Sequence, residues 1–217
     1  MNKKNILTAA VSLSLVACLS IGATLAYFTD KTQTAENVLT TGNINVKLID
    51  RTEGPGEEDT WLADDPQDNT GITYTHVMPG DEISKLVGLG VEEGSESCYM
   101  AMSVSISHNN GLDMEDIYED IRAQAIDNGW LCMDAPNGDL YCFYPEKVNG
   151  TVPMSLVTLF DTVNVPESWT NEYANTTFNI DVKGAAIQAA NLEAPNEALN
   201  NTTCNELSNM LQQVALG

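Results

Sequence analysis

Residues 97–107 read SCYMAMSVSIS, and this stretch decides the fold. Apolar side chains alternate along it with small or polar ones, and a period of two is typical of a β-strand. The face expected in the core carries Cys98, Met100, Met102, Val104 and Ile106. The other face carries serines beside Tyr99 and Ala101, so we expect it to be wet or thinly covered.

Five further segments carry a strand-like pattern, with turn residues between them. They are residues 43–50, 71–77, 83–91, 154–163 and 177–182, and the last of these can run on to residue 188. Pro79-Gly80-Asp81 is a strong turn signal before the third of these segments. Gly88 and Gly90 interrupt that third segment, which predicts a bulge or a position at the edge of a sheet.

Residues 53–68 are predicted to form a loop. Seven acidic residues are spread through this stretch together with two prolines and two glycines, which disfavour regular structure. Clustered carboxylates can bind calcium, although the spacing here fits no EF-hand loop. A solvated acidic loop is the simpler interpretation, and we expect no cofactor.

A helical period replaces the strand pattern over residues 113–128. The apolar residues of this stretch recur three or four positions apart: Met114, Ile117, Tyr118, Ile121 and Ala125. Acidic residues near its start suit the positive end of a helix dipole, and Gly129 is placed to end the helix. We therefore expect one amphipathic helix inserted between strands.

Residues 130–144, WLCMDAPNGDLYCFY, are predicted to form a β-hairpin. Pro136 and Gly138 suit a type I turn that closes with a glycine bulge, with residues 135 and 139 as a pair. Counting outward places Cys132 directly opposite Cys142, where the Cβ atoms come near the range of a disulfide. Cys132–Cys142 is therefore the candidate disulfide, although an even number of cysteines in an exported chain permits such bonds without requiring them.

Residues 195–217 form a tail with its own helical signal. Thr203-Cys204-Asn205-Glu206 has the form of a capping box. The apolar positions that follow are typical of a short amphipathic helix: Leu207, Met210, Leu211 and Val214. This helix docks either on a partner or, as the simpler expectation, on its own domain.

Together these patterns predict a mostly β protein. We expect an antiparallel β-sandwich with a jelly-roll-like layout, one inserted amphipathic helix and a short C-terminal helix. The expected boundaries are a signal peptide at residues 1–26, the sandwich domain at residues 27–194 and the tail at residues 195–217.

The N-terminus has the layout of an export signal. Lys3 and Lys4 precede residues 6–26, which carry no charge and end in small residues that predict cleavage after Ala26. This apolar stretch is also long enough to span a bilayer, so a retained membrane anchor is an alternative. A lipobox-like sequence at residues 15–18 adds a second alternative, lipidation of Cys18, although the apolar run continues beyond it.

Residues 23–30 read ATLAYFTD and residues 37–46 read NVLTTGNINV. With the hydrophobic signal, these segments resemble the TasA/camelysin family of exported Gram-positive proteins. Residues 77–81 and 182–192 resemble later family segments more loosely. The resemblance implies a dedicated signal peptidase of the SipW type, and it allows the cut to fall after Tyr27 instead of Ala26.

The resemblance further implies a structural protein of the cell surface or the biofilm matrix, which assembles into fibres with itself or with related matrix subunits. We expect assembly by strand addition, because an unpaired sheet edge is a template for another chain. The segment freed by cleavage supplies the candidate strand, with Phe28, Thr29, Asp30, Val38 and Leu39. Protein that lacks residues 27–42 is then expected to stay monomeric.

A metallopeptidase is the enzymatic alternative, because camelysin-type proteins have been described as such. The chain has two histidines, His76 and His108, and no HExxH run. Catalytic zinc usually needs three protein ligands, and nothing in the spacing brings these histidines together. Since no nucleophile elbow, P-loop or dinucleotide fingerprint is present either, we expect no enzyme. A surface adhesin that does not polymerise is the third class.

The charge of the chain limits its partners. The 217 residues carry a formal net charge of −22 at pH 7, and removal of Lys3 and Lys4 with the signal makes it more negative. Such a surface repels nucleic acid and anionic lipid. We therefore expect no nucleic-acid partner, and membrane contact only through an uncleaved signal.

Overall fold

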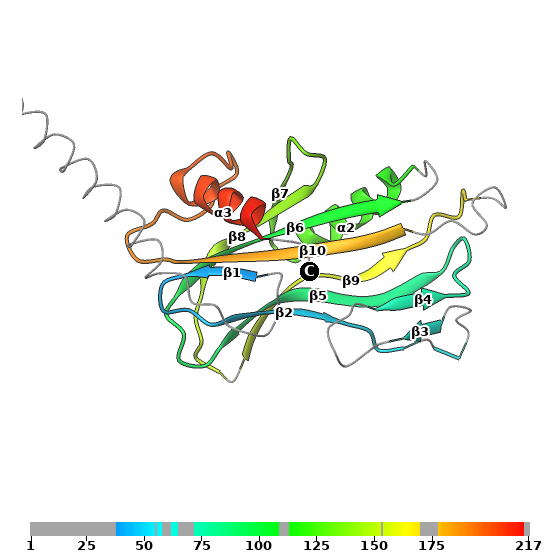
Figure 1. Cartoon of the computed structure of the whole chain (residues 1–217), viewed down its shortest axis with the longest axis horizontal. Coiled ribbons are helices and arrows are strands. Elements are labelled where there is room, and N and C mark those ends of the chain that lie inside the picture. The colour runs from blue at the N-terminus through cyan, green and yellow to red at the C-terminus, as the bar shows by residue number, and fades with distance from the viewer. Residues whose placement is uncertain are drawn as a thin grey trace, which may run out of the picture.

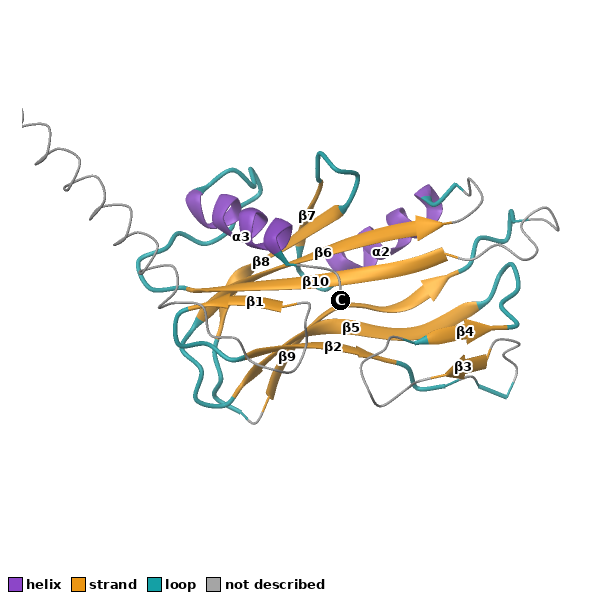
Figure 2. Cartoon of the chain, in the orientation of Figure 1, coloured by secondary structure: helices purple, strands orange, loops and turns teal. Residues whose placement is uncertain are grey.

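The computed structural model describes residues 38–54, 56–57, 62–64, 72–108, 113–152, 154–169 and 178–214. A five-stranded sheet has the order β1 (Val38–Thr41), β10 (Phe178–Gln188), β6 (Cys98–His108), β8 (Leu140–Val148) and β7 (Leu131–Asp134). A three-stranded sheet has the order β2 (Val46–Arg51), β5 (Glu82–Glu92) and β9 (Met154–Asn164). The helices in this described part of the chain are α2 (Glu115–Asp127) and α3 (Thr202–Gln213) (Figures 1 and 2).

The two sheets pack face to face as a sandwich, which confirms the predicted fold class. Alternate residues of β5 and β6 meet in the core, among them Val87, Leu89, Met100 and Met102, which are fully buried. Every strand pair of these two sheets is antiparallel except β1 with β10, which is parallel.

The alternation along β6 gives the predicted strand, but its second face is only partly wet. Tyr99 and Ala101 are buried in a second core with Leu207 and Leu211 of α3. At the other end of β6 the same face is open, since Ser107 is exposed. The sequence of β6 alone does not reveal this cover, because the covering helix lies at the far end of the chain.

Gly88 and Gly90 mark an irregular strand in the middle of a sheet, not an edge. β5 pairs with β2 on one side and β9 on the other, and its register with β9 shifts between Ser84 and Gly88. The expected bulge is therefore present and the alternative of an edge is wrong. A Cβ atom on Gly90 would lie 2.5 Å from the sulfur of Met154, so a side chain there would displace Met154.

Helix α2 follows the predicted period. Ile117, Ile121 and Ala125 are fully buried on its apolar face. Gly129, at a φ of +86°, donates its N–H to the carbonyl of Ile126 and ends the helix as expected.

The hairpin of β7 and β8 has the predicted register. The Ala135 N–H donates to the carbonyl of Asp139 at 2.8 Å, and Gly138 takes the left-handed conformation at a φ of +89°. Cys132 lies opposite Cys142 with their Cα atoms 4.1 Å apart, and the structure joins their sulfur atoms in a disulfide. This bond ties the edge strand β7 to the rest of its sheet.

Loss of this disulfide is expected to lower the free energy of unfolding by about 2–3 kcal/mol, because the bond restricts a short loop of the unfolded chain. Urea denaturation of the Cys132→Ala/Cys142→Ala variant measures the change. Added reductant should bring the wild type to the stability of the variant and leave the variant unchanged. Equal stability of the two proteins without reductant would contradict this expectation.

Helix α3 docks on its own domain, but the predicted capping box is wrong. The cap is Asn201, whose side chain accepts the N–H of Cys204 at 2.9 Å. Thr203 is instead fully buried, and its hydroxyl donates to the carbonyl of Glu193 at 2.6 Å. An asparagine two residues earlier thus takes the capping role, and the threonine anchors the preceding loop.

The acidic stretch is not entirely a loop. Residues Leu62–Asp64 form β3, which pairs antiparallel with β4 (Thr73–Thr75). The expectation of a loop without a strand is therefore wrong at this point. Ala63 of β3 and Tyr74 of β4 pack against the main core, so this small hairpin is held on the sandwich.

Candidate assembly edge

One flank of the sandwich leaves part of a long strand without a partner. β10 pairs with β6 along its whole length from Phe178 to Gln188. On its other side β1 pairs only with residues Gly184–Ile187. Within the described parts of the chain, residues 178–183 therefore have no strand beside them on that side, as the short β1 beside the long β10 shows (Figure 1).

The close packing of β1 beside β10 depends on Gly184. A Cβ atom at this position would lie 2.6 Å from the Leu89 side chain of the facing sheet and 3.2 Å from the side chain of Val38. Because Gly184 has no side chain, Val38 and Leu89 can both pack against the strand. β1 thus begins, at Val38, where the unpaired part of β10 ends, at Lys183.

The same flank carries the edge of the other sheet. The chain leaves β1 at Gly42, whose φ of +88° requires glycine, and crosses to β2, an edge strand of the three-stranded sheet. β2 contacts both β1 and β10. We name the unpaired part of β10, residues 178–183, together with the outer edge of β2 the assembly flank.

Apolar side chains on the assembly flank are only partly covered. Phe178 and Ile180 of β10 and Leu48 of β2 pack against the main core but remain half-buried. Arg51 is exposed on β2 and Lys183 is half-buried on β10, although the chain as a whole is strongly acidic. An added strand would find unpaired backbone groups and apolar contacts at this flank, where Lys183 lies two residues from Asp181.

A buried ion pair holds β2 on its neighbour. The Lys85 ammonium group, on β5, lies 2.6 and 2.8 Å from the two carboxylate oxygens of Asp50 on β2. The side chain of Lys85 is 7% exposed and that of Asp50 is 26% exposed. The pair fixes the end of β2 where the β5 register shifts.

The candidate strand residues fall in two places. Val38 and Leu39 belong to β1 in the molecule's own sheet. The expectation that these two residues are free to join a neighbour is therefore wrong. Phe28, Thr29 and Asp30 lie outside the described residues, as do the cleavage positions Ala26 and Tyr27 and the lipobox-like Cys18. Among the described residues, no helix is long and apolar enough to cross a membrane.

The histidines do not form part of a metal centre in the described structure. His108 is exposed at the end of β6, and His76 follows β4 with a φ of +60°. No group of three or more His, Cys, Asp or Glu residues that could hold a metal ion occurs among the residues that the structure describes.

The two remaining described cysteines are packing residues. Cys98 is fully buried between the sheets, and burial raises the pKa of its thiol to about 12. Cys204 lies on the buried face of α3, and burial is also the main cause that raises the pKa of its thiol. Both thiols are therefore neutral at ordinary pH, which makes them poor nucleophiles.

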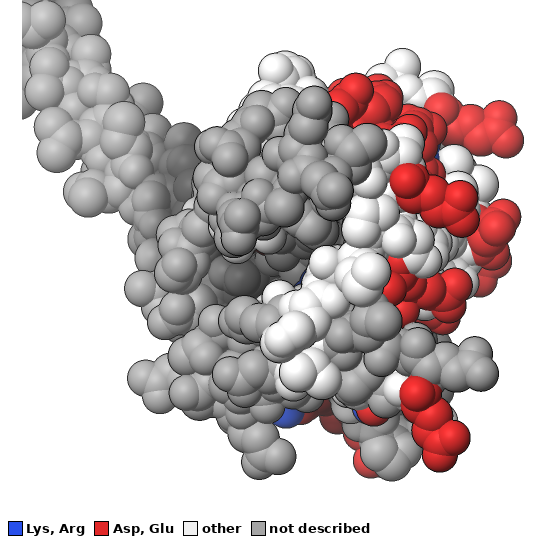
Figure 3. Space-filling view, turned by 90° about the vertical axis from the view of Figure 1, so that its right-hand side faces the viewer, with Lys and Arg blue, Asp and Glu red and all other residues white. Residues whose placement is uncertain are grey.

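The acidic surface is visible at one end of the molecule. Asp and Glu side chains gather along one side of the face seen in Figure 3, where Lys and Arg are barely visible.

Sequence reasoning missed a polar stripe on α2. Asp120, Gln124 and Asn128 are spaced four residues apart, so they lie on one face of the helix and its end, beside the apolar face. Side chains of this stripe hydrogen-bond to β9. The spacing was a signal that could have been found, but it does not say which strand the stripe meets.

Comparison with known proteins gave no match: no protein-family model fits the chain, and no curated protein or solved structure is significantly similar to it.

Proposed function

We propose that this chain is an exported structural protein of a Gram-positive cell surface or extracellular matrix, and that its subunits assemble into fibres by strand addition. The observation that carries the proposal is the unpaired part of β10 beside the short β1. Unpaired N–H and C=O groups of an edge strand are a template for another chain. Main-chain hydrogen bonds then supply affinity, and pockets for alternate side chains supply specificity.

The composition and the N-terminus support the cellular part of the proposal. The export-type leader and the TasA/camelysin-like segments at residues 23–30 and 37–46 imply secretion and processing by a dedicated signal peptidase. The strand donor in this proposal is the segment freed by that cut, with Phe28, Thr29 and Asp30. Because β1 already contains Val38 and Leu39, the donated part ends before Val38.

Electron microscopy of the processed protein tests the proposal. Protein that begins at residue 27 or 28 is expected to form filaments, and protein that begins at residue 38 is expected to stay monomeric. The second boundary keeps β1 intact, so a loss of filaments does not reflect a damaged sheet. A synthetic peptide of residues 28–37 should slow filament growth, whereas a scrambled peptide should not.

Other outcomes would support the competing classes. If the protein that begins at residue 27 or 28 and the protein that begins at residue 38 both stay monomeric, the proposed assembly is wrong. Ligand binding by such monomers would indicate an adhesin. Casein cleavage that is abolished both by a chelator and by His76→Ala would instead indicate a metallopeptidase.

A further inference from the structure

The second edge strand of the three-stranded sheet, β9, is covered by a helix along part of its length, unlike the assembly flank. β9 runs from Met154 to Asn164 and pairs with β5 on one side only within the described structure. Its other side is a sheet edge, which would offer unpaired backbone groups to another chain. Helix α2 packs along this strand.

Gln124 of α2 takes the place that a neighbouring strand would occupy. Its amide nitrogen donates to the carbonyl of Thr162 at 3.1 Å, and its amide oxygen accepts the N–H groups of Asp161 and Thr162 at 3.2 and 3.3 Å. A primary amide carries the same donor and acceptor as a peptide group. One side chain therefore satisfies backbone groups that a strand would otherwise pair with.

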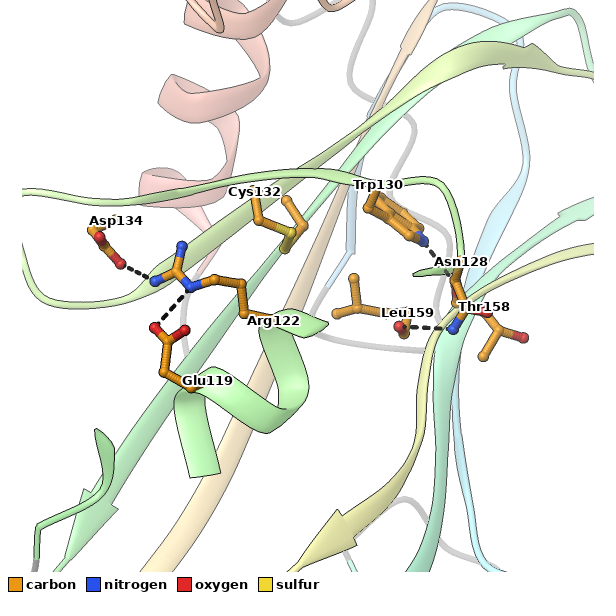
Figure 4. The surroundings of a disulfide bond; sticks show 9 residues. Glu119, Arg122, Asn128, Trp130, Cys132, Asp134, Thr158 and Leu159 are labelled. Carbon is orange, nitrogen blue, oxygen red and sulfur yellow. Dashed lines mark hydrogen bonds and ion pairs between the residues drawn. A yellow bond between two sulfur atoms is a disulfide. The ribbon is translucent and has the colours of Figure 1, made fainter. Parts of the chain in front are cut away.

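The residues around Gln124 extend this cover in both directions along β9. The Asn128 amide donates to the carbonyl of Leu159 at 3.2 Å, and the Trp130 indole donates to the carbonyl of Thr158 at 2.7 Å (Figure 4). At the other end, Asp120 accepts the side-chain amide of Asn164 at 2.9 Å. The covered part of the edge thus runs from Thr158 to Asn164.

Helix α2 is also fixed to the opposite sheet. Arg122 pairs with Asp134 at the end of β7 and with Glu119 on its own helix (Figure 4). The Cys132–Cys142 disulfide ties β7 in turn to β8. α2 therefore bridges the edge strands β9 and β7 and closes this side of the sandwich.

We propose that α2 is an edge cap, which stops a second copy of this chain from adding a strand to β9. The cap leaves residues 154–157 uncovered, and Met154 and Leu156 there are 45% and 39% exposed. An exposed apolar edge favours pairing with another chain, so the rest of β9 has to be blocked. The inference goes beyond the proposed function, because it concerns the flank that is not used for assembly.

The test is the variant Gln124→Ala/Asn128→Ala, in which the helix keeps its apolar face. We expect the amides of Asp161 and Thr162 to exchange with solvent at least ten times faster than in the wild type. Analytical ultracentrifugation at raised protein concentration should show new oligomers, because β9 can then pair with β9 of another copy. Asp127→Asn is the matched control: it lies in the last turn of α2, is exposed, and should change neither measurement.

A second change separates edge pairing from general unfolding. Leu156→Lys places a charge on the exposed part of β9, and in the double variant it should abolish the new oligomers while the faster exchange remains. Oligomers that persist with Leu156→Lys, or a double variant that associates no more than the wild type, would overturn the proposal. All samples begin at residue 38, so a failure of the proposed fibre assembly does not affect the outcome.

Discussion

Replacing Trp130 with alanine is expected to lower the free energy of unfolding by about 3–5 kcal/mol, as for other large-to-small changes in a packed core. Trp130 is 1% exposed where α2, β8 and β9 meet. Its ring packs on that of Tyr144 with centroids 5.2 Å apart, and its N–H donates to the Thr158 carbonyl. Urea denaturation, followed by far-UV circular dichroism, measures the change.

The variant Trp130→Phe separates the contribution of apolar packing from that of the indole hydrogen bond. It keeps much of the apolar contact but leaves the Thr158 carbonyl without its indole donor, so a smaller loss of about 1–3 kcal/mol is expected. The Thr158 carbonyl belongs to the capped edge of β9. A loss in Trp130→Phe as large as that in Trp130→Ala would mean that the indole hydrogen bond, and not the apolar contact, accounts for the loss.

Removing one partner of the Lys85–Asp50 pair is expected to be the second most harmful change. Asp50→Ala leaves the Lys85 ammonium buried without its counter-charge, which in a fully buried pair costs about 3–5 kcal/mol. Because Asp50 is 26% exposed, water can partly replace the carboxylate, and we expect about 2–4 kcal/mol. The same urea denaturation assay applies.

The double variant Asp50→Leu/Lys85→Met should lie within about 1 kcal/mol of the wild type, because it removes both charges and fills the space with apolar groups. Lys47→Ala is the matched control on the same strand: its pair with Glu92 is more exposed and should contribute less than about 1 kcal/mol. A double variant as unstable as Asp50→Ala alone would mean that packing, not charge, explains the loss.

Local patterns predicted the elements that depend on near neighbours in the chain. The alternation of β6, the period of α2 and the register that sets Cys132 opposite Cys142 each follow from a short stretch of sequence. Two local predictions failed: the acidic stretch contains the short strand β3, and Asn201 instead of Thr203 caps α3, because the sequence does not rank these two residues for that role.

The elements that depend on distant partners could not be predicted. β1 is a short strand whose partner, β10, lies near the other end of the chain, and no local period distinguishes it from the polar segment before it. Nor did the sequence tell which face of β6 would be covered by α3, or that Gln124 would meet the backbone of β9. The candidate assembly flank follows from these long-range pairings alone.

The difference between the open assembly flank and the covered strand β9 limits the symmetry that an assembly of copies can have. The assembly flank offers an unpaired strand, whereas β9 is covered by α2. Two copies that met through identical surfaces would form a closed dimer with a two-fold axis, and growth would stop there. In the proposed assembly a donor segment and an acceptor edge are unlike surfaces, so each added copy would present a fresh acceptor. Such a head-to-tail contact either closes as a ring or continues as a helical filament.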